Sequence, residues 1–99
     1  MPFVIAHPEG LASAASHLNG VGSLLTAQHA TAAAATTGLP PAAADEVSAL
    51  TATQFSAHAA VYQAVGAQAM AIRELFTAML DASASSYVAT EAANAIAVC

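Results

Sequence analysis

The large apolar side chains of this chain recur at helical spacing in two segments separated by a short break. In the first segment, Leu11, Leu18 and Leu25 stand seven residues apart. In the second, apolar and amide side chains follow one another mostly at intervals of three or four: Val47, Leu50, Gln54, Val61, Val65, Gln68, Ile72, Leu75 and Met79. This spacing places side chains on one face of an α-helix and is typical of the seam of a helical bundle. The pattern therefore predicts two helices and no strands.

The limits of the first helix are marked by residues that start and stop helices. Pro8 fits the first helical position, where its missing N–H costs nothing, and Glu9 suits the positive end of the helix dipole. Alanine, the strongest helix former, dominates the following residues. The run Gly38-Leu39-Pro40-Pro41 cannot continue a helix. We therefore expect a first helix over about 8–37 and a turn over about 38–42.

The second helix is expected over about 43–81. Asp45 and Glu46 would then lie in its first turn, which is the end that acidic side chains favour. The small, polar run 82–86 is expected to fray or bend. A C-terminal tail over about 82–99 follows, and its last segment, from Tyr87 to about Val98, is expected to be helical when bound and loose when free.

A second row of side chains on the later helix, Phe55, Tyr62, Ala69 and Phe76, also steps by seven. A hairpin of two helices has one internal seam, so this aromatic row is expected to face solvent and to mark a partner surface. The other interpretation is that the aromatic side chains cover the hairpin's own core. We predict an all-α fold, with two long antiparallel helices that complete a four-helix bundle with a partner. The candidate interface residues are Leu11, Leu18, Leu25, Phe55, Tyr62, Val65, Ile72, Phe76 and Met79.

Composition narrows the classes of partner. Only 7% of the 99 residues are charged, against about 25% in a typical soluble domain. Arg73 is the sole basic side chain besides histidine, and the formal net charge of −5 argues against nucleic acid and anionic membrane surfaces. Polar residues interrupt every window of about 20 residues that could span a membrane. The N-terminus lacks the basic and apolar regions of a cleavable signal peptide.

No constellation of catalytic or metal-binding residues is present in the sequence. The four histidines offer no pair at i and i+3 or i+4, which a metal site on a helix would need. There is no Gly-x-Ser-x-Gly elbow and no glycine-rich phosphate loop. We expect no enzyme activity, metal, cofactor or small-molecule substrate. The single cysteine, Cys99, excludes an internal disulfide.

Two polar groupings lie at helical spacing. Gln54, His58 and Tyr62 are one turn apart and could form a hydrogen-bonded trio inside a helix interface or a pH-responsive contact; the former is the simpler interpretation. Tyr87 and Glu91 stand at i and i+4, so a helical tail would show both on one face. Spacing alone gives that pair no function.

Taken together, the motifs resemble the N-terminal domain of the mycobacterial PE family. The residues that carry the resemblance run in family order along essentially the whole chain: Phe3-Val4, Pro8-Glu9, Ala42 to Ser48, Phe55 to Ala59, Tyr62-Gln63, and Tyr87-x-x-x-Glu91-Ala92-Ala93-Asn94. Pro8-Glu9, for which the family is named, is a weak signal alone; the ordered set is specific. The stretch Ala69 to Arg73 differs from the amino-acid sequence that is commoner in the family at this place. The choice of partner could therefore differ from that of other members.

The resemblance implies a helical hairpin that forms a heterodimer with a PPE-family protein and is exported by a type VII secretion system. It also implies that Tyr87 and Glu91 form the Y-x-x-x-[D/E] element of the export signal. The Trp-x-Gly turn that completes such signals must come from the PPE partner, because this chain has no Trp. An EspG-type chaperone would bind the PPE protein. The chain would be cytoplasmic before export, then secreted or at the cell surface, with a role in host–pathogen or cell-envelope biology.

Three alternatives remain open from the residues. A membrane-active or pore-associated hairpin at the cell surface fits the apolar composition, but flanking basic residues are absent. A homodimeric four-helix bundle would bury the same faces. A small enzyme has no constellation to support it.

Overall fold

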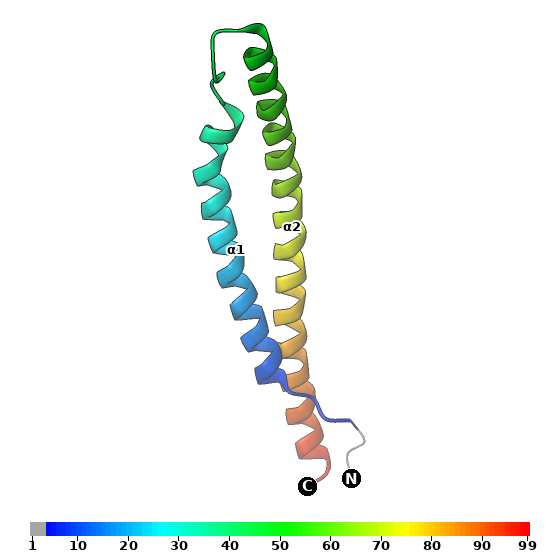
Figure 1. The fold of residues 1–99 in the computed structure, drawn as a ribbon. Helices are drawn as coiled ribbons and strands as arrows, with labels where there is room; N and C mark the ends of the chain where they lie inside the picture. Colours follow the sequence, from blue (N-terminus) through cyan, green and yellow to red (C-terminus); the bar gives the residue numbers. More distant parts are fainter. Residues whose placement is uncertain (1–3) are drawn as a thin grey trace. The chain divides into compact units, whose positions relative to one another are not determined.

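The chain is built from two long α-helices joined by a turn, in a computed structural model that describes residues 4–99 (Figure 1). Helix α1 spans Pro8–Thr37, and helix α2 spans Glu46–Ala97. No strand occurs between residues 4 and 99. The predicted all-α helical hairpin is therefore confirmed. Phe3, one of the residues that carried the family resemblance, lies outside the described residues.

The chain divides into two compact units, and each contains a segment of both helices. The closed unit, Ser23–Ile72, holds the end of α1, the turn and the first half of α2. The terminal unit combines the chain up to Gly22 with Arg73–Cys99. Within each unit, the α1 and α2 segments run in opposite directions and are joined by hydrogen bonds between the helices.

Helix α1 has the predicted bounds because both of its ends are specified locally. At its start, the carbonyl oxygen of His7 accepts hydrogen bonds from the amides of Gly10 and Leu11, at 3.0 and 3.2 Å. At its end, the amide of Gly38 donates to the carbonyl of Ala34 at 3.2 Å. The prolines that follow Leu39 then prevent another turn of helix.

Helix α2 begins three residues later than predicted, because Asp45 caps the helix instead of lying inside it. The Oδ1 atom of Asp45 accepts from the amide of Ser48 at 2.8 Å, and Oδ2 accepts from the Ser48 hydroxyl at 2.8 Å. This is the N-cap arrangement, in which a side-chain oxygen satisfies an amide that has no partner within the helix. The hydrogen bonds from Ser48 to the charged carboxylate lower the pKa of Asp45. Ala43 and Ala44 therefore belong to the turn.

The Asp45 cap makes a prediction for stability. Asp45→Ala should lower the thermal midpoint of the folded protein, whereas Asp45→Asn, which keeps an acceptor oxygen, should lower it less. Because the folded-state pKa of Asp45 is depressed, its contribution is present above the unfolded pKa and is lost as pH falls through the folded pKa. Thermal melts by circular dichroism should thus show the Ala variant and the parent protein converging as the pH drops below about 3.8. A constant difference down to a pH of about 2 would contradict the capping role.

The predicted fraying at 82–86 is wrong, since α2 continues without a break to Ala97. The run contains no Gly or Pro, and alanine favours helix strongly enough for the serines to be tolerated. Ala84 is also buried in the terminal unit, so the helix is held by packing at this point. Most of the predicted tail is therefore regular helix.

The predicted seam of α2 is also wrong. The side chains of α2 that are buried or half-buried recur at intervals of three and four, and most of them are small or polar: Ser48, Ala52, Ser56, Ala59, Gln63, Gly66, Met70, Arg73, Thr77, Leu80 and Ala84. The row that was expected there is exposed: Val47, Leu50, Gln54, Val61, Val65, Gln68, Ile72, Leu75 and Met79. The two helices thus meet largely through small residues of α2, which allow close approach of the backbones. A hairpin of two helices has no third element to pack on the outer side of α2, so the large side chains there remain exposed.

The leucines of α1 contribute larger side chains to the seam than most of the α2 residues do. Leu11 and Leu18 are half-buried in the terminal unit beside fully buried Ala15, and Leu25 is half-buried in the closed unit. The fully buried apolar residues of the described chain are all alanines. The hairpin therefore has a thin core, and such a small buried volume gives it little stability of its own.

Candidate partner interface

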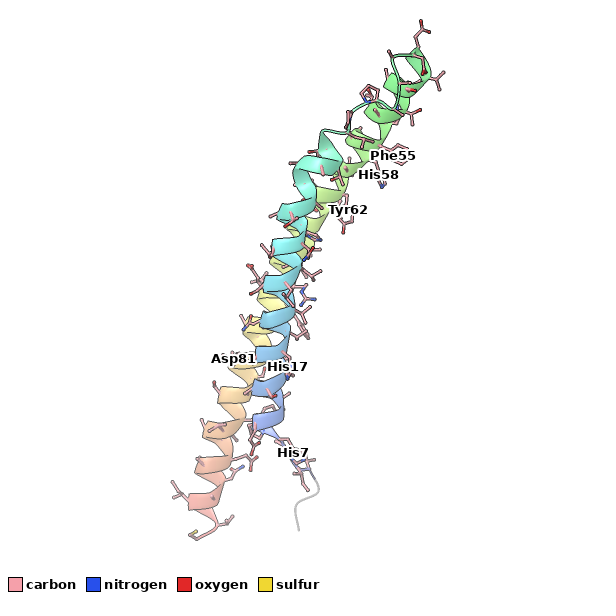
Figure 2. All side chains as sticks on the ribbon, turned by 60° about the vertical axis from the view of Figure 1, so that its left-hand side comes forward. His7, His17, Phe55, His58, Tyr62 and Asp81 are labelled. Carbon is pink, nitrogen blue, oxygen red and sulfur yellow. The ribbon has the colours of Figure 1, made fainter. Side chains whose placement is uncertain are left out.

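The closed unit exposes large apolar side chains on one side of α2. Phe55 is 62% exposed, and Tyr62, Val65 and Ile72 are exposed to a similar extent. In Figure 2, Phe55, His58 and Tyr62 leave α2 on the same side of the helix, as their spacing of three and four residues requires. These side chains do not cover the hairpin's own core.

The terminal unit shows the same arrangement with different residues. Phe76 is 59% exposed, and Leu75 and Met79 are more exposed still. The prediction that the aromatic row 55, 62, 69 and 76 faces solvent is thus confirmed in both units. We define the apolar side of α2 as a set of exposed large side chains in three adjacent rows that each step by seven: Val47, Phe55, Val61, Tyr62, Val65, Ile72, Leu75, Phe76 and Met79.

Small residues predominate on the opposite flank of α2 in the closed unit. Exposed alanines recur there at intervals of three and four: Ala57, Ala60, Ala64, Ala67 and Ala71. Leu50, seven residues before Ala57, is the large apolar exception at 62% exposure. Large apolar side chains are therefore concentrated on one side of the helix, which differs from the single scattered apolar residues of an ordinary surface. Burying one such side chain contributes about 1.5–3 kcal/mol. The apolar side is a surface that a second protein could cover.

Threonine hydroxyls do not make these surfaces polar. Thr51 and Thr53 donate to carbonyl oxygens one turn earlier in α2, at 2.7 and 2.9 Å, and Thr31, Thr36 and Thr37 do the same in α1. Each hydroxyl hydrogen is thus used within its own helix, and the methyl group is left for packing.

Three of the nine candidate interface residues lie elsewhere. Leu11, Leu18 and Leu25 are half-buried in the seam between α1 and α2, so their primary contacts are within the hairpin. The other six candidates, all on α2, are exposed. Helical spacing could not separate the two sets, because a row that packs within the chain and a row that packs against a partner have the same period.

Tyr62 contacts a histidine that spacing along one helix could not identify. Its hydroxyl lies 3.4 Å from Nε2 of His29, and the two rings meet edge to face with centroids 5.6 Å apart. The side-chain amide of Gln63 donates to the carbonyl oxygen of His29 at 3.3 Å. The His29 ring packs close to α2 at Gly66, where a Cβ atom would lie 3.4 Å from it, in ordinary van der Waals contact. The polar grouping in this region therefore crosses between helices, whereas the predicted trio followed α2 alone.

Arg73, the only Lys or Arg in the chain, lies half-buried in the seam of the terminal unit. Its Nη2 atom donates to the carbonyl oxygen of Leu18 at 3.2 Å. Its Nε atom is buried with no hydrogen-bond partner in the described part of the chain. An unsatisfied buried donor typically costs about 1–3 kcal/mol, so this side chain weakens the seam that it helps to fill.

Arg73→Met is expected to stabilise the protein. Methionine keeps the length of the aliphatic stem and removes the buried unpaired donor, which should raise the free energy of unfolding by about 1 kcal/mol. Arg73→Ala should lower it, because the stem is lost and a void remains. Thermal melts of the two variants would test this. Equal destabilisation by Met and Ala would show that the guanidinium itself holds the helices together.

The last part of α2 is exposed on all sides within the terminal unit. Every residue from Ser85 to Cys99 is exposed, and Tyr87 and Glu91 lie in regular helix. Their spacing of four residues therefore puts both side chains on one face of an uncovered helix. Pro8 and Glu9 begin α1, where Pro8 is half-buried and Glu9 exposed.

The described residues give little support to other kinds of site. Between residues 4 and 99, no three His, Cys, Asp or Glu side chains are grouped so that they could hold a metal ion. No helix of that part is long and apolar enough to cross a membrane. The Cys99 thiol is exposed and donates to the carbonyl of Ala95 at 3.1 Å.

Comparison with known proteins places this arrangement in a family. The model of the PE family matches residues 4–94. The PE family protein PE13 of Mycobacterium tuberculosis strain H37Rv is 60% identical over 97 residues, which cover 98% of both chains. The same organism's PE-PGRS family protein PE_PGRS33 is 50% identical over 95 residues, which cover 96% of this chain and 19% of that protein. Its PE family protein PE8 is 45% identical over 97 residues, with 98% of this chain and 35% of PE8 covered.

Proposed function

Because the chain belongs to the PE family of mycobacterial proteins, we propose that it is a non-catalytic interaction protein that pairs with a PPE-family protein. The apolar side of α2 carries this proposal. Phe55 in the closed unit and Phe76 in the terminal unit remain largely exposed in the isolated chain. Pairing with a second pair of helices would bury them and would supply the core that the hairpin lacks.

Export by a type VII secretion system is the second part of the proposal. Tyr87 and Glu91 lie on one face of the exposed end of α2, where a receptor could contact both side chains. The chain contains no Trp, so the Trp-x-Gly turn of a composite signal would come from the PPE partner. An EspG-type chaperone would bind the PPE protein before export. The pair would then act outside the cytoplasm or at the cell surface, in cell-envelope or host–pathogen biology.

Co-expression tests the pairing. The chain expressed alone should be insoluble or should melt without cooperativity, whereas co-expression with a PPE-family partner should give a stable one-to-one complex by size exclusion with light scattering. The reason is the thin core of the isolated hairpin, in which the fully buried apolar residues are all alanines. The thermal melts that test the Asp45 and Arg73 variants are therefore made on the complex. A soluble monomer with a cooperative melt would argue strongly against obligate pairing. A homodimer of the chain alone would indicate a self-associated four-helix bundle.

The exposed apolar side also motivates the alternative, a membrane-active hairpin at the cell surface. An amphipathic helix at a membrane usually carries Lys and Arg on its polar face, and α2 has only Arg73, which lies in the seam. Flotation of the purified complex with anionic liposomes should therefore leave the protein at the bottom of the gradient. Co-flotation would favour the membrane function.

A further inference from the structure

An open pocket of about 330 Å³ lies beside the turn of the closed unit. Its walls come from the turn and from the first turns of α2: Leu39, Pro40, Ala42, Val47, Ser48, Thr51, Ala52 and Phe55. Val47 and Phe55 also belong to the apolar side of α2. The pocket is therefore continuous with the surface proposed to meet a partner.

The side-chain hydroxyls on the pocket wall already donate their hydrogens within the chain. The Ser48 hydroxyl donates to Oδ2 of Asp45 at 2.8 Å, and the Thr51 hydroxyl donates to the carbonyl of Val47 at 2.7 Å. The Ser48 amide is held by Oδ1 of Asp45. Small-molecule sites normally place a few free polar groups to orient the ligand, and here the hydroxyl hydrogens point away from an occupant. This chemistry fits an apolar side chain better than a polar metabolite.

The charge beside the pocket is of one sign. Asp45 and Glu46 are the only Asp, Glu, Lys or Arg residues of the closed unit, and they directly precede Val47 and Ser48 in the chain. Both are exposed, and the Asp45 carboxylate is kept ionised by its bonds to Ser48. An occupant with a cation next to its apolar group would be complementary to this edge.

We propose that this pocket receives one apolar side chain of the partner protein, and that a Lys or Arg within one helical turn of that side chain pairs with Glu46 and Asp45. The proposal rests on the proposed function, because the occupant belongs to the paired chain. It adds a local determinant of which partner fits: a cation beside the anchor distinguishes partners that are otherwise equally apolar. A larger depression of about 680 Å³, which shares Leu39 and Ala52 with this pocket, is lined mainly by small and hydroxyl-bearing residues and offers no comparable anchor site.

The test uses the purified complex with a PPE-family protein that co-purifies with this chain, and measures subunit dissociation by exchange with labelled chain. Ala42→Trp places an indole in the pocket, and Ala43→Trp is the matched control, since Ala43 is equally exposed in the turn but does not line the pocket. Ala42→Trp should raise the dissociation rate by about tenfold, and Ala43→Trp should leave it near the parent value. Equal dissociation rates for the two variants and the parent would show that the pocket receives no side chain of the partner. The proposed heterodimer would not be affected by that result.

A second pair of variants tests the charge. Glu46→Gln should raise the dissociation rate by about threefold at low salt, and the difference should vanish at high salt because screening removes the attraction. Glu74→Gln removes an exposed acid of the terminal unit and should have no such effect. If Glu46→Gln has the same dissociation rate as Glu74→Gln at low salt, the proposed ion pair between Glu46 and a Lys or Arg of the partner is refuted. If no PPE-family protein pairs with the parent chain, the proposed function fails and the occupant assigned here fails with it.

Discussion

Phe76→Asp is expected to abolish pairing with the PPE partner while leaving the helices of this chain formed. Phe76 is 59% exposed in the isolated chain, so the hairpin loses little when the ring is removed. In the complex, the same position would bury a carboxylate among apolar side chains at a cost of several kcal/mol. We expect affinity to fall by about a hundredfold or more. Phe55→Asp should act in the same way in the closed unit.

The matched control, used together with Phe55→Asp, is Ala67→Asp. Ala67 is exposed in the closed unit, as Phe55 is, and its neighbours three and four residues away are not on the apolar side: Gln63, Ala64, Met70 and Ala71. The substitution introduces the same charge and loses more helix propensity than Phe→Asp does, so it is a strict control for general effects on folding. Co-purification with a tagged partner should be lost for Phe76→Asp and Phe55→Asp and kept for Ala67→Asp. Equal recovery of the Phe and Ala variants with the partner would mean that the apolar side of α2 is not the pairing surface.

Tyr87→Ala and Glu91→Ala are each expected to block export without disturbing the complex. Both residues lie in the part of α2 after Ala84, where every side chain is exposed and none contributes to the seam. Truncating them should thus leave thermal stability within about 0.5 kcal/mol of the parent protein. The measurement is the ratio of secreted to cell-associated protein in a host with a working type VII system, together with recovery of the intact complex from the cytosol.

Two substitutions control for the export test. Glu91→Asp keeps a carboxylate at the fourth position after Tyr87 and should still be exported, because the Y-x-x-x-[D/E] element that the resemblance implies allows either acid. Val88→Ala truncates an exposed neighbour in the same helical turn and should also be exported. Normal secretion of both Tyr87→Ala and Glu91→Ala would show that the two residues are not part of an export signal. Loss of secretion together with loss of the complex would assign the residues to folding or pairing instead.

The first helix could be predicted closely because its limits depend on neighbouring residues. Pro8 at the start and Pro40-Pro41 after the end specify the limits by what their own backbone can and cannot do, and no distant contact is needed. The start of α2 depends on which acceptor captures the free amides. Two acidic residues stand at that place, and only the geometry of Asp45 with Ser48 decides that the helix begins at Glu46. The small polar residues from Ser83 to Ser86 suggest fraying, but α2 continues through them because the run has neither Gly nor Pro and Ala84 is held by packing.

The exposure of the aromatic row could be predicted from the number of apolar helix faces, which is larger than the number that two helices can bury against each other. Two helices have one mutual seam, so a second row at the same period has to face outward, as Phe55 and Phe76 do. Which row of α2 forms the seam could not be obtained in this way. The choice depends on how the side chains of both helices share the space between them, and the α2 residues that are buried there are small, such as Ala52 and Ala84. The contact between His29 and Tyr62 was out of reach for the same reason, since 33 residues separate its partners.

The sequence by itself determined that this protein is a pair of charge-poor helices with more apolar surface than a hairpin can bury, because spacing and composition fix how many apolar faces exist. It also carried the ordered motifs of the PE family, which the comparisons then established. Only the tertiary structure decided which face of α2 packs against α1 and which faces remain exposed. Close approach of two helices selects small side chains for the seam, which sends most of the large ones of α2 outward and leaves Tyr87 and Glu91 on an uncovered helix end.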